Sequence, residues 1–285
     1  MRQSQTAVGA ALCRLVEQSQ PPATRMFDDP LVGRLVDPVV AMMASSGAMR
    51  DGLVESIGRG VVGGIIMRTR YIDDVVAEGA RGGIAQLVIL GAGLDTRAFR
   101  LACLAETTVF EVDLPETQDA KRRKLKGVRS AARDVRFVPL DVTTDSLAAA
   151  LAGAGWDSGR PSVFVAEGVT QYLPESAVRA MFQLIGRAAA GSVLVFTYVP
   201  LAVLAQASGG TWARGVLEGV ETHEPWIFGI DPAALAGFLA GFGLDLVDEV
   251  GADDYRARYL TPRGRDLAVG DLERAALAVV VHASS

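Results

Sequence analysis

The chain has 285 residues, 50% of them hydrophobic and 21% charged, which excludes intrinsic disorder as the main state and leaves ample length for a buried core. The formal net charge of -5 excludes a protein that coats nucleic acid through a general grip on phosphates, because such proteins are basic. The sequence has two cysteines, two histidines and no CxxC pair, so it predicts neither a disulfide framework nor a zinc site. We therefore expect a reduced, metal-independent, cytoplasmic protein.

The first eighty residues predict helices at about 6–18, 31–43 and 61–78. Pro21-Pro22, Asp37-Pro38 and the small-residue cluster 45–47 separate them. The short apolar stretch 7–12 lacks a convincing cleavage context, so we expect no signal peptide. Residues 1–80 are therefore assigned to an N-terminal helical cap.

From residue 86 onwards, short apolar runs alternate with helical stretches. The runs lie at 87–90, 108–112, 135–140, 162–166, 193–199, 244–250 and 277–282, with helices near 115–128, 144–151, 175–190 and 232–240. This alternation predicts an α/β fold, a doubly wound, Rossmann-like and mostly parallel seven-stranded sheet. Residues 81–285 would form this domain. The cap would cover the strand ends, where open α/β sheets bind ligands.

One region has the length of a membrane span. Residues 188–213 carry no charge, and about 20 such residues suffice to cross a bilayer. The segment VLVFTYV at 193–199 is rich in β-branched and aromatic residues, and Pro200 interrupts the run. This pattern favours a central strand buried on both faces, followed by a loop or helix, over the transmembrane alternative.

The first predicted strand runs directly into a glycine loop. Gly91 and Gly93 allow a tight turn and a close approach of the backbone to a ligand. A GxG alone is weak evidence, because any turn from a strand to a helix can contain one. The third glycine of the dinucleotide fingerprint is absent, since Thr96 occupies its position. This absence is an argument against NAD or FAD binding, which stays an alternative.

Acidic residues follow three successive predicted strands. Asp113 lies 20 residues after Gly93, where Rossmann-like sheets bind ribose hydroxyls; it can also cap the helix that begins near Pro115. Asp141 ends the third strand and can accept from an adenine amine or cap the next helix. Glu167 ends the fourth strand, as a cleft residue or a satisfied loop carboxylate. Three acids after a glycine loop favour a nucleoside site.

Several segments resemble the leucine carboxyl methyltransferase family, within the class I S-adenosylmethionine (SAM)-dependent methyltransferases. The matching pieces are LGAGLDTR (90–97), FEVDLP (110–115), LDV (140–142) and AEGVTQYLP (166–174). MRTRYIDD (67–74) is similar to the family's arginine-bearing segment, and FDDP (27–30) to a recurrent element of its bacterial members. The resemblance covers residues 25–200 and is diffuse beyond. It implies SAM as the cofactor and a substrate-facing insertion around 200–230, beyond the fifth strand.

The resemblance also implies where the nucleoside of SAM lies. Gly91 and Gly93 would pass beneath its methionyl and ribose part, and Asp113 would hold the ribose hydroxyls. Asp141 and the backbone of Val142 would face the adenine.

The methionyl end of SAM would lie near three further residues. Glu167 would face the amino group, and Arg68 or Arg70 would pair with the carboxylate, because the planar guanidinium matches a carboxylate. Spacing leaves the choice between the two arginines open. Either arginine can instead pair at the surface with Asp73 or Asp74. These two acids do not predict a metal site, because no further carboxylate or histidine clusters with them.

Two residues are candidates for catalysis. His223, in THEPWIFG, can line an aromatic acceptor pocket with Trp226 and Phe228, or lie exposed on a packed loop. Tyr172 can point into the cleft or pack against the next helix. A carboxylate acceptor, with a pKa of roughly 4, needs no base, whereas a phenol at roughly 10 would benefit from one.

We therefore predict a SAM-dependent O-methyltransferase that methylates a carboxylate or hydroxyl oxygen of a small molecule. Bacterial members of the family that the chain resembles include enzymes of polyketide-type secondary metabolism. The alternatives are a nicotinamide-dependent oxidoreductase, which would use the same glycine loop and Asp113, and a non-catalytic SAM-binding scaffold. We expect no nucleic-acid or membrane partner. The oligomeric state stays open, with a homodimer as one option.

Overall fold

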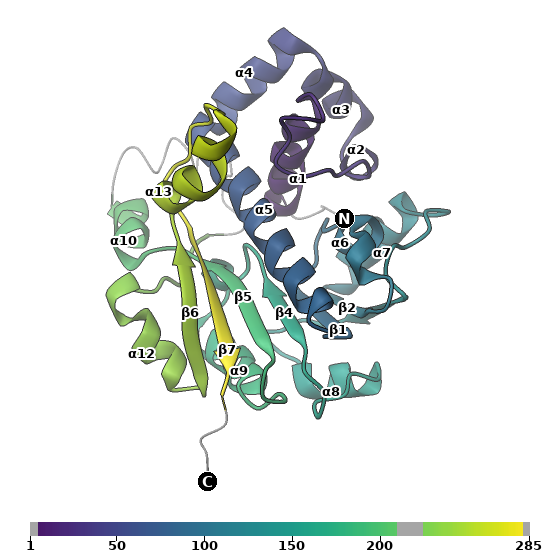
Figure 1. The fold of residues 1–285 in the computed structure, drawn as a ribbon, viewed down its shortest axis with the longest axis vertical. Coiled ribbons are helices and arrows are strands. Elements are labelled where there is room, and N and C mark those ends of the chain that lie inside the picture. Colours follow the sequence, from purple (N-terminus) through teal and green to yellow (C-terminus); the bar gives the residue numbers. More distant parts are fainter. Residues whose placement is uncertain (1–4, 210–224, 282–285) are drawn as a thin grey trace.

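The computed structural model describes residues 5–209 and 225–281. Its centre is one seven-stranded sheet in the order β3-β2-β1-β4-β5-β7-β6 (Figure 1). The first five strands pair in parallel, and β7 runs antiparallel between β5 and β6. The strands are β1 (Gln86–Leu90), β2 (Thr108–Asp113), β3 (Asp134–Pro139), β4 (Val163–Ala166), β5 (Val193–Tyr198), β6 (Leu244–Val250) and β7 (Arg274–Val280). The predicted fold class is confirmed.

Strand β1 lies where the strand order reverses. Val88 pairs with Phe110 of β2 on one side and with Phe164 of β4 on the other. The loops that leave β1 and β4 therefore diverge to opposite faces and open a crevice at their carboxyl ends, which is the place where sheets of this class bind ligands.

Between residue 5 and the sheet lie five helices: α1 (Gln5–Gln18), α2 (Val32–Leu35), α3 (Pro38–Ser45), α4 (Gly47–Ile57) and α5 (Arg59–Arg81). The stretch 31–43, predicted as one helix, contains α2 and most of α3. A new helix begins there because Pro38 occupies its first turn and the Asp37 side chain accepts from Val39 N at 2.8 Å. Helix α4 was not predicted.

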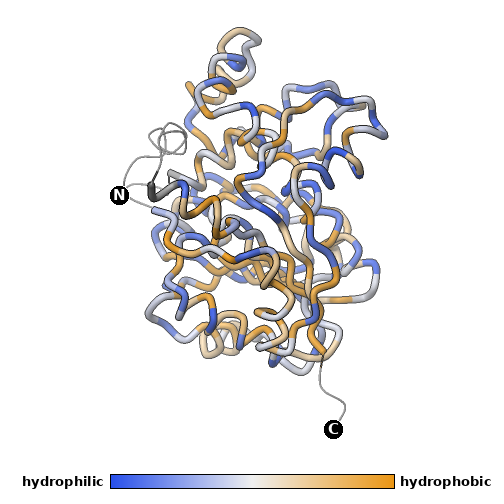
Figure 2. Tube along the Cα trace, turned by 90° about the vertical axis from the view of Figure 1, so that its left-hand side faces the viewer, coloured by the Kyte–Doolittle hydropathy of each residue, from blue (hydrophilic) through white to orange (hydrophobic). Residues whose placement is uncertain are grey.

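The two faces of the sheet are buried under different helices, because side chains alternate along each strand. Leu87 and Ile89 pack in one core with Ile66 and Ile72 of α5. On the other face, Val88 and Leu90 share a core with residues of α8, α9 and α12. Figure 2 shows apolar segments concentrated in the sheet and polar segments at the outer turns. In the described ranges 91–209 and 225–281, the α-helices after β1 are α6 (Arg97–Arg100), α7 (Pro115–Lys124), α8 (Leu147–Gly153), α9 (Glu175–Ile185), α10 (Leu201–Gly209), α12 (Leu235–Ala240) and α13 (Ala252–Tyr255).

The uncharged region 188–213 begins just after α9 and continues into β5 and α10. β5 is a central strand between β4 and β7, as predicted, and its residues from Leu194 to Tyr198 are buried. Within residues 5–209 and 225–281, no helix has the length and apolar character needed to cross a membrane.

Candidate cofactor and active site

A cavity of about 520 Å³ lies at the carboxyl ends of β1, β2 and β4, beneath α1 and α5. This volume is within the range of about 300–1,000 Å³ that is typical of small-molecule sites. Its wall brings together most of the predicted site residues: Arg68, Gly91, Gly93, Asp113, Asp141, Val142, Glu167 and Tyr172. Arg70 does not line it, and His223 lies outside the described residues.

The glycine loop forms the floor of this cavity. Gly91 and Gly93 have φ angles of 60° and 40°, in the left-handed region that side chains other than glycine rarely adopt. A Cβ on Gly91 would also lie 2.6 Å from Cγ2 of Val169. The loop can therefore approach a ligand closely only with glycine at this position.

We expect Gly91→Ala to weaken SAM binding and to lower stability by about 1–2 kcal/mol, the cost of a left-handed residue with a Cβ. Gly127→Ala is the matched control. Gly127 has a φ of 79° and does not line the cavity, and a Cβ added to it would meet no atom within 4 Å. Calorimetric SAM titration and thermal unfolding measure both effects. Equal SAM affinity in the two variants would contradict the role of the loop.

Asp113 connects the second strand to the glycine loop. Its Oδ2 accepts from Gly93 N at 2.5 Å, and its Oδ1 accepts from Leu114 N at 2.7 Å. Helix α7 begins at Pro115 with Leu114 as its N-cap residue, so Asp113 is not the helix cap that the sequence allowed as an alternative. Burial raises the pKa of Asp113, while the bond from Gly93 acts against this rise.

Asp141 and Val142 line the cavity beyond the third strand. Asp141 Oδ1 accepts from Thr143 N at 2.9 Å and from Thr143 Oγ1 at 2.6 Å, and these bonds lower its pKa. The cap of α8 is Ser146, whose side chain accepts from Ala149 N at 3.3 Å. Asp141 therefore stabilises its own turn at the cavity rim.

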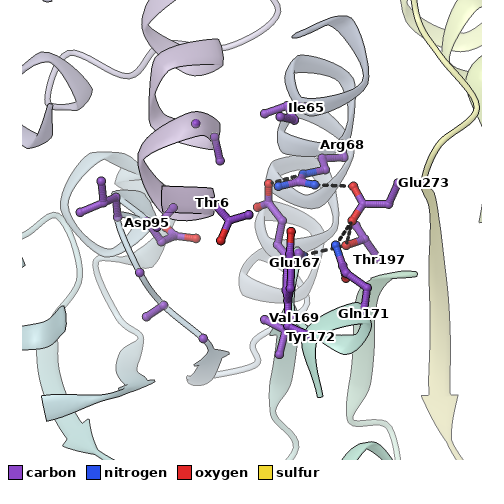
Figure 3. Close-up of a pocket in the computed structure, with 18 of the residues that line it drawn as sticks. Thr6, Ile65, Arg68, Asp95, Glu167, Val169, Gln171, Tyr172, Thr197 and Glu273 are labelled. Atoms are coloured by element: carbon purple, nitrogen blue, oxygen red, sulfur yellow. Dashed lines mark hydrogen bonds and ion pairs between the residues drawn. The ribbon is translucent and has the colours of Figure 1, made fainter. Parts of the chain in front are cut away.

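Glu167 lies between two guanidinium groups. Its Oε1 accepts from Arg68 Nε at 3.0 Å, and its Oε2 lies 2.7 Å from Arg97 Nη1. Burial acts to raise the pKa of Glu167, but Arg97 and Arg68 outweigh it, so the pKa lies below its usual value. Figure 3 shows Arg68 between Glu167 and a second carboxylate, Glu273.

The two candidate arginines of α5 face different surroundings. Arg68 lines the cavity, whereas Arg70 Nε lies 3.0 Å from Asp74 Oδ2 and its Nη1 donates to Met26 O at 2.8 Å. Arg70 also lies over the ring of Tyr259, at 5.6 Å from the centroid. Only Arg68 is thus placed where it can contact a ligand in the cavity.

Arg97, from the LDTR segment, is a site residue that the sequence patterns did not indicate. It is 2% exposed and its guanidinium contacts Asp73, Asp95 and Glu167, with the Asp73 contact at 2.7 Å. Asp73, which the sequence allowed as a surface residue, is buried in this cluster. Arg97 therefore connects the glycine loop to α5 and to the end of β4.

Thr96, at the position of the missing third glycine, is buried in a second polar cluster. Its hydroxyl donates to Asp29 Oδ2 at 2.8 Å and accepts from Arg14 Nη1 at 3.1 Å. Arg14 also donates to Leu94 O at 2.6 Å. The FDDP and LDTR segments thus meet in space, and together they hold α1 against the glycine loop.

Glu273, directly before β7, is a further site residue that the sequence did not indicate. It accepts from Thr197 Oγ1 at 2.7 Å, from Gln171 Nε2 at 3.1 Å and from Arg68 Nη1. An isolated acid in a region of diffuse resemblance carries no motif that distinguishes it from a surface residue. Among the described residues, no His, Cys, Asp or Glu cluster has the arrangement of a metal site.

Aromatic and aliphatic side chains form the remaining wall. Trp226 Nε1 donates to the Tyr172 hydroxyl at 3.1 Å, and both residues line the cavity. Phe228, predicted as a possible neighbour, is buried in the core instead. The aliphatic part of the wall comes from α4, α5 and the segment before β7: Ile57, Val61, Ile65 and Leu272.

The chain is similar to known proteins of one family. Residues 7–186 match the leucine carboxyl methyltransferase family. A candidate S-adenosyl-L-methionine-dependent methyltransferase from Frankia alni is 34% identical over 241 residues, covering 79% of this chain and 80% of that protein. A relative of the same description from Streptomyces coelicolor is 33% identical over 240 residues, covering 84% and 81%.

A solved structure shares the fold. The chain is similar to a protein of the DUF574 family from Streptomyces avermitilis, with a TM-score of 0.61, 17% identity and coverage of 94% of this chain and 97% of that one. The sequence matches, which extend over most of the chain, show more than a common fold. The chain belongs to the leucine carboxyl methyltransferase family of S-adenosyl-L-methionine-dependent methyltransferases.

Proposed function

We propose that this chain transfers a methyl group from SAM to a carboxylate or hydroxyl oxygen of a small-molecule metabolite, in polyketide-type secondary metabolism in the cytoplasm. Its membership of a SAM-dependent methyltransferase family argues against the alternative of a nicotinamide-dependent oxidoreductase. The observation that supports a small acceptor is the cavity itself, whose 520 Å³ lie between the strand ends and the helices α1 and α5.

The residues at the cavity fit a SAM molecule, because the left-handed glycines leave its floor open and carboxylates stand at its rim. When bound, SAM supplies the activated methyl group. We assign the backbone of Gly91 and Gly93 to its methionyl and ribose part and the Asp113 carboxylate to the ribose hydroxyls. Asp141 and Val142 would contact the adenine.

The methionyl end of the cofactor would be bound by the ion-pair network of Arg68, Glu167 and Arg97. We assign Glu167 to the amino group, since its carboxylate faces the cavity and its pKa is held low by Arg97 and Arg68 despite burial. Arg68 would hold the methionyl carboxylate. Because both residues are fixed by partners from other elements, the cofactor would meet a site that is already arranged.

The task of the protein in methyl transfer is to align the acceptor oxygen and to exclude water. We propose that Tyr172, held by Trp226, orients the acceptor against the aliphatic wall. A carboxylate acceptor is ionised at neutral pH and needs no base. For a hydroxyl acceptor, His223 stays the sequence-based prediction for the group that takes the proton.

The proposal is tested by incubating the enzyme with methyl-labelled SAM and a panel of carboxylic acids and phenols. We expect label in an ester, which alkali hydrolyses, or in an ether, which it does not. Trp226→Ala should reduce turnover more than SAM affinity, because Trp226 holds only the acceptor side. Transfer to nitrogen or sulfur would contradict O-methylation, and SAM binding without any transfer would favour the scaffold alternative.

A further inference from the structure

Tyr255, at the end of α13, is a buried residue whose hydroxyl hydrogen-bonds to no residue within 5–209 or 225–281. The residue is 2% exposed and lines the cavity. The hydroxyl of a tyrosine whose ring is largely buried normally has a hydrogen-bond partner. The partner of Tyr255 is therefore to be sought among molecules that enter the cavity.

A second donor without a partner in the described part of the chain belongs to Arg68. Its Nε and Nη1 contact Glu167 and Glu273, whereas its Nη2 bonds to none of the residues that the structure describes. Nη2 lies 3.1 Å from where a Cβ on Gly168 would stand, and Gly168 has a φ of 64°. The glycine keeps this corner of the guanidinium open.

We propose that the Tyr255 hydroxyl and Arg68 Nη2 bind one carboxylate together, the methionyl carboxylate of SAM. This inference rests on the proposed cofactor site and adds Tyr255 to it. The two donors line the same cavity, and a neutral hydroxyl beside a guanidinium complements a carboxylate. The acceptor molecule is the other possible source of a carboxylate, and substitution of Tyr255 separates the two.

The charges around Tyr255 support its role as a donor. Burial and the charge of Glu273 hold the pKa of Tyr255 well above its usual value, while Arg68 acts in the opposite direction. Both charged groups are thus within electrostatic reach of the hydroxyl. Because the hydroxyl keeps its proton at any working pH, it can donate to an anion but cannot serve as a base.

The ring of Tyr255 is held firmly in place. It packs edge-on against Tyr71 of α5, with centroids 6.3 Å apart and an interplanar angle of 68°. The Tyr71 hydroxyl donates to Asp248 at 3.0 Å, and Arg258 contacts the same carboxylate. A π-helical turn, Arg256–Leu260, follows Tyr255 directly; such turns are rare and frequent at functional sites.

Tyr255→Phe tests the proposal, because it removes the hydroxyl and keeps the ring. We expect the variant to bind S-adenosylhomocysteine about tenfold more weakly, as for one hydrogen bond to a charged group. Its affinity for 5′-methylthioadenosine, which lacks the amino-acid part, should not change. Tyr71→Phe is the matched control, since it removes a hydroxyl that lies outside the cavity wall; it should leave both affinities within about twofold, below a single hydrogen bond.

Titration calorimetry of the intact protein with both nucleosides gives the answer. An unchanged affinity of Tyr255→Phe for S-adenosylhomocysteine would overturn the proposal. The two donors would then be assigned to a carboxylate of the acceptor molecule. An equal loss for both nucleosides would also overturn it, because it would show a general disturbance of the site. If the unaltered protein bound S-adenosylhomocysteine but methylated no acid or phenol, the proposed function would fail while this test would still stand.

Discussion

Arg97→Met is expected to lower the free energy of unfolding by about 3–5 kcal/mol, the usual cost of removing one partner from a buried ion pair. Arg97 is almost completely buried, and its removal would leave the carboxylates of Asp73, Asp95 and Glu167 without their shared partner. Urea denaturation followed by circular dichroism measures the change. Arg122→Met is the control, because its contact with Asp119 is exposed and long, at 4.0 Å.

The control should change stability by less than about 0.5 kcal/mol, as for ordinary surface substitutions. A similarly small effect of Arg97→Met would show that the network is dispensable.

The pH dependence of the stability gives a second measurement. Although burial acts to raise the pKa of Asp95, Arg97 brings it down to about 2. The stability from this pair is present above the ordinary pKa of roughly 4, is lost as the pH falls towards 2, and should be missing in the variant.

Asp113→Ala should weaken SAM binding at least about 100-fold, since two hydrogen bonds to a charged group are each worth about 1.5–3 kcal/mol. The substitution would remove the proposed ribose contact and also the carboxylate that accepts from Gly93 N. Calorimetric titration with SAM measures the loss, and thermal unfolding verifies that the variant is folded. Asp119→Ala, on the exposed side of α7, is the control.

The affinity of the unaltered protein for SAM should also fall on acidification. Burial raises the pKa of Asp113, so the carboxylate takes up a proton at a higher pH than an exposed aspartate and then loses its capacity to accept two hydrogen bonds. Asp113→Asn should abolish this dependence. If Asp113→Ala bound SAM as tightly as the unaltered protein, the assignment of the cofactor site would be wrong.

The sheet could be predicted from the sequence because most of its strands are short runs rich in apolar residues and bounded by turns. The boundaries of β7 were less accurate: it begins at Arg274 rather than Leu277, since Arg274, Ala275 and Ala276 do not resemble a strand until they pair with β5. Helix α4 was missed because none of its residues is buried. Its Leu53, Val54 and Ile57 pack against the core only partly buried, and so short an apolar face leaves a weak periodic pattern in the sequence.

The position of the strand-end acids could be predicted, because the carboxyl ends of parallel strands lie at one edge of the sheet. The choice between Arg68 and Arg70 could not, since both have the same chemistry and two residues apart on a helix face different sides. Thr96, Arg97 and Glu273 make their contacts with segments far away in the sequence. Their importance follows from tertiary packing, which a local motif does not contain.

The shared core of α5 and the sheet has a consequence for acceptor preference. Ile66 and Ile72 of α5 belong to the core on one face of the sheet, so substitutions on that side of α5 would disturb the packing of the sheet. The hairpin of α3 and α4 has little buried surface, yet Ile57 at its end reaches the cavity. Under the proposed function, substitutions in residues 38–57 are therefore expected to change the acceptor side of the cavity with little effect on the core of the sheet.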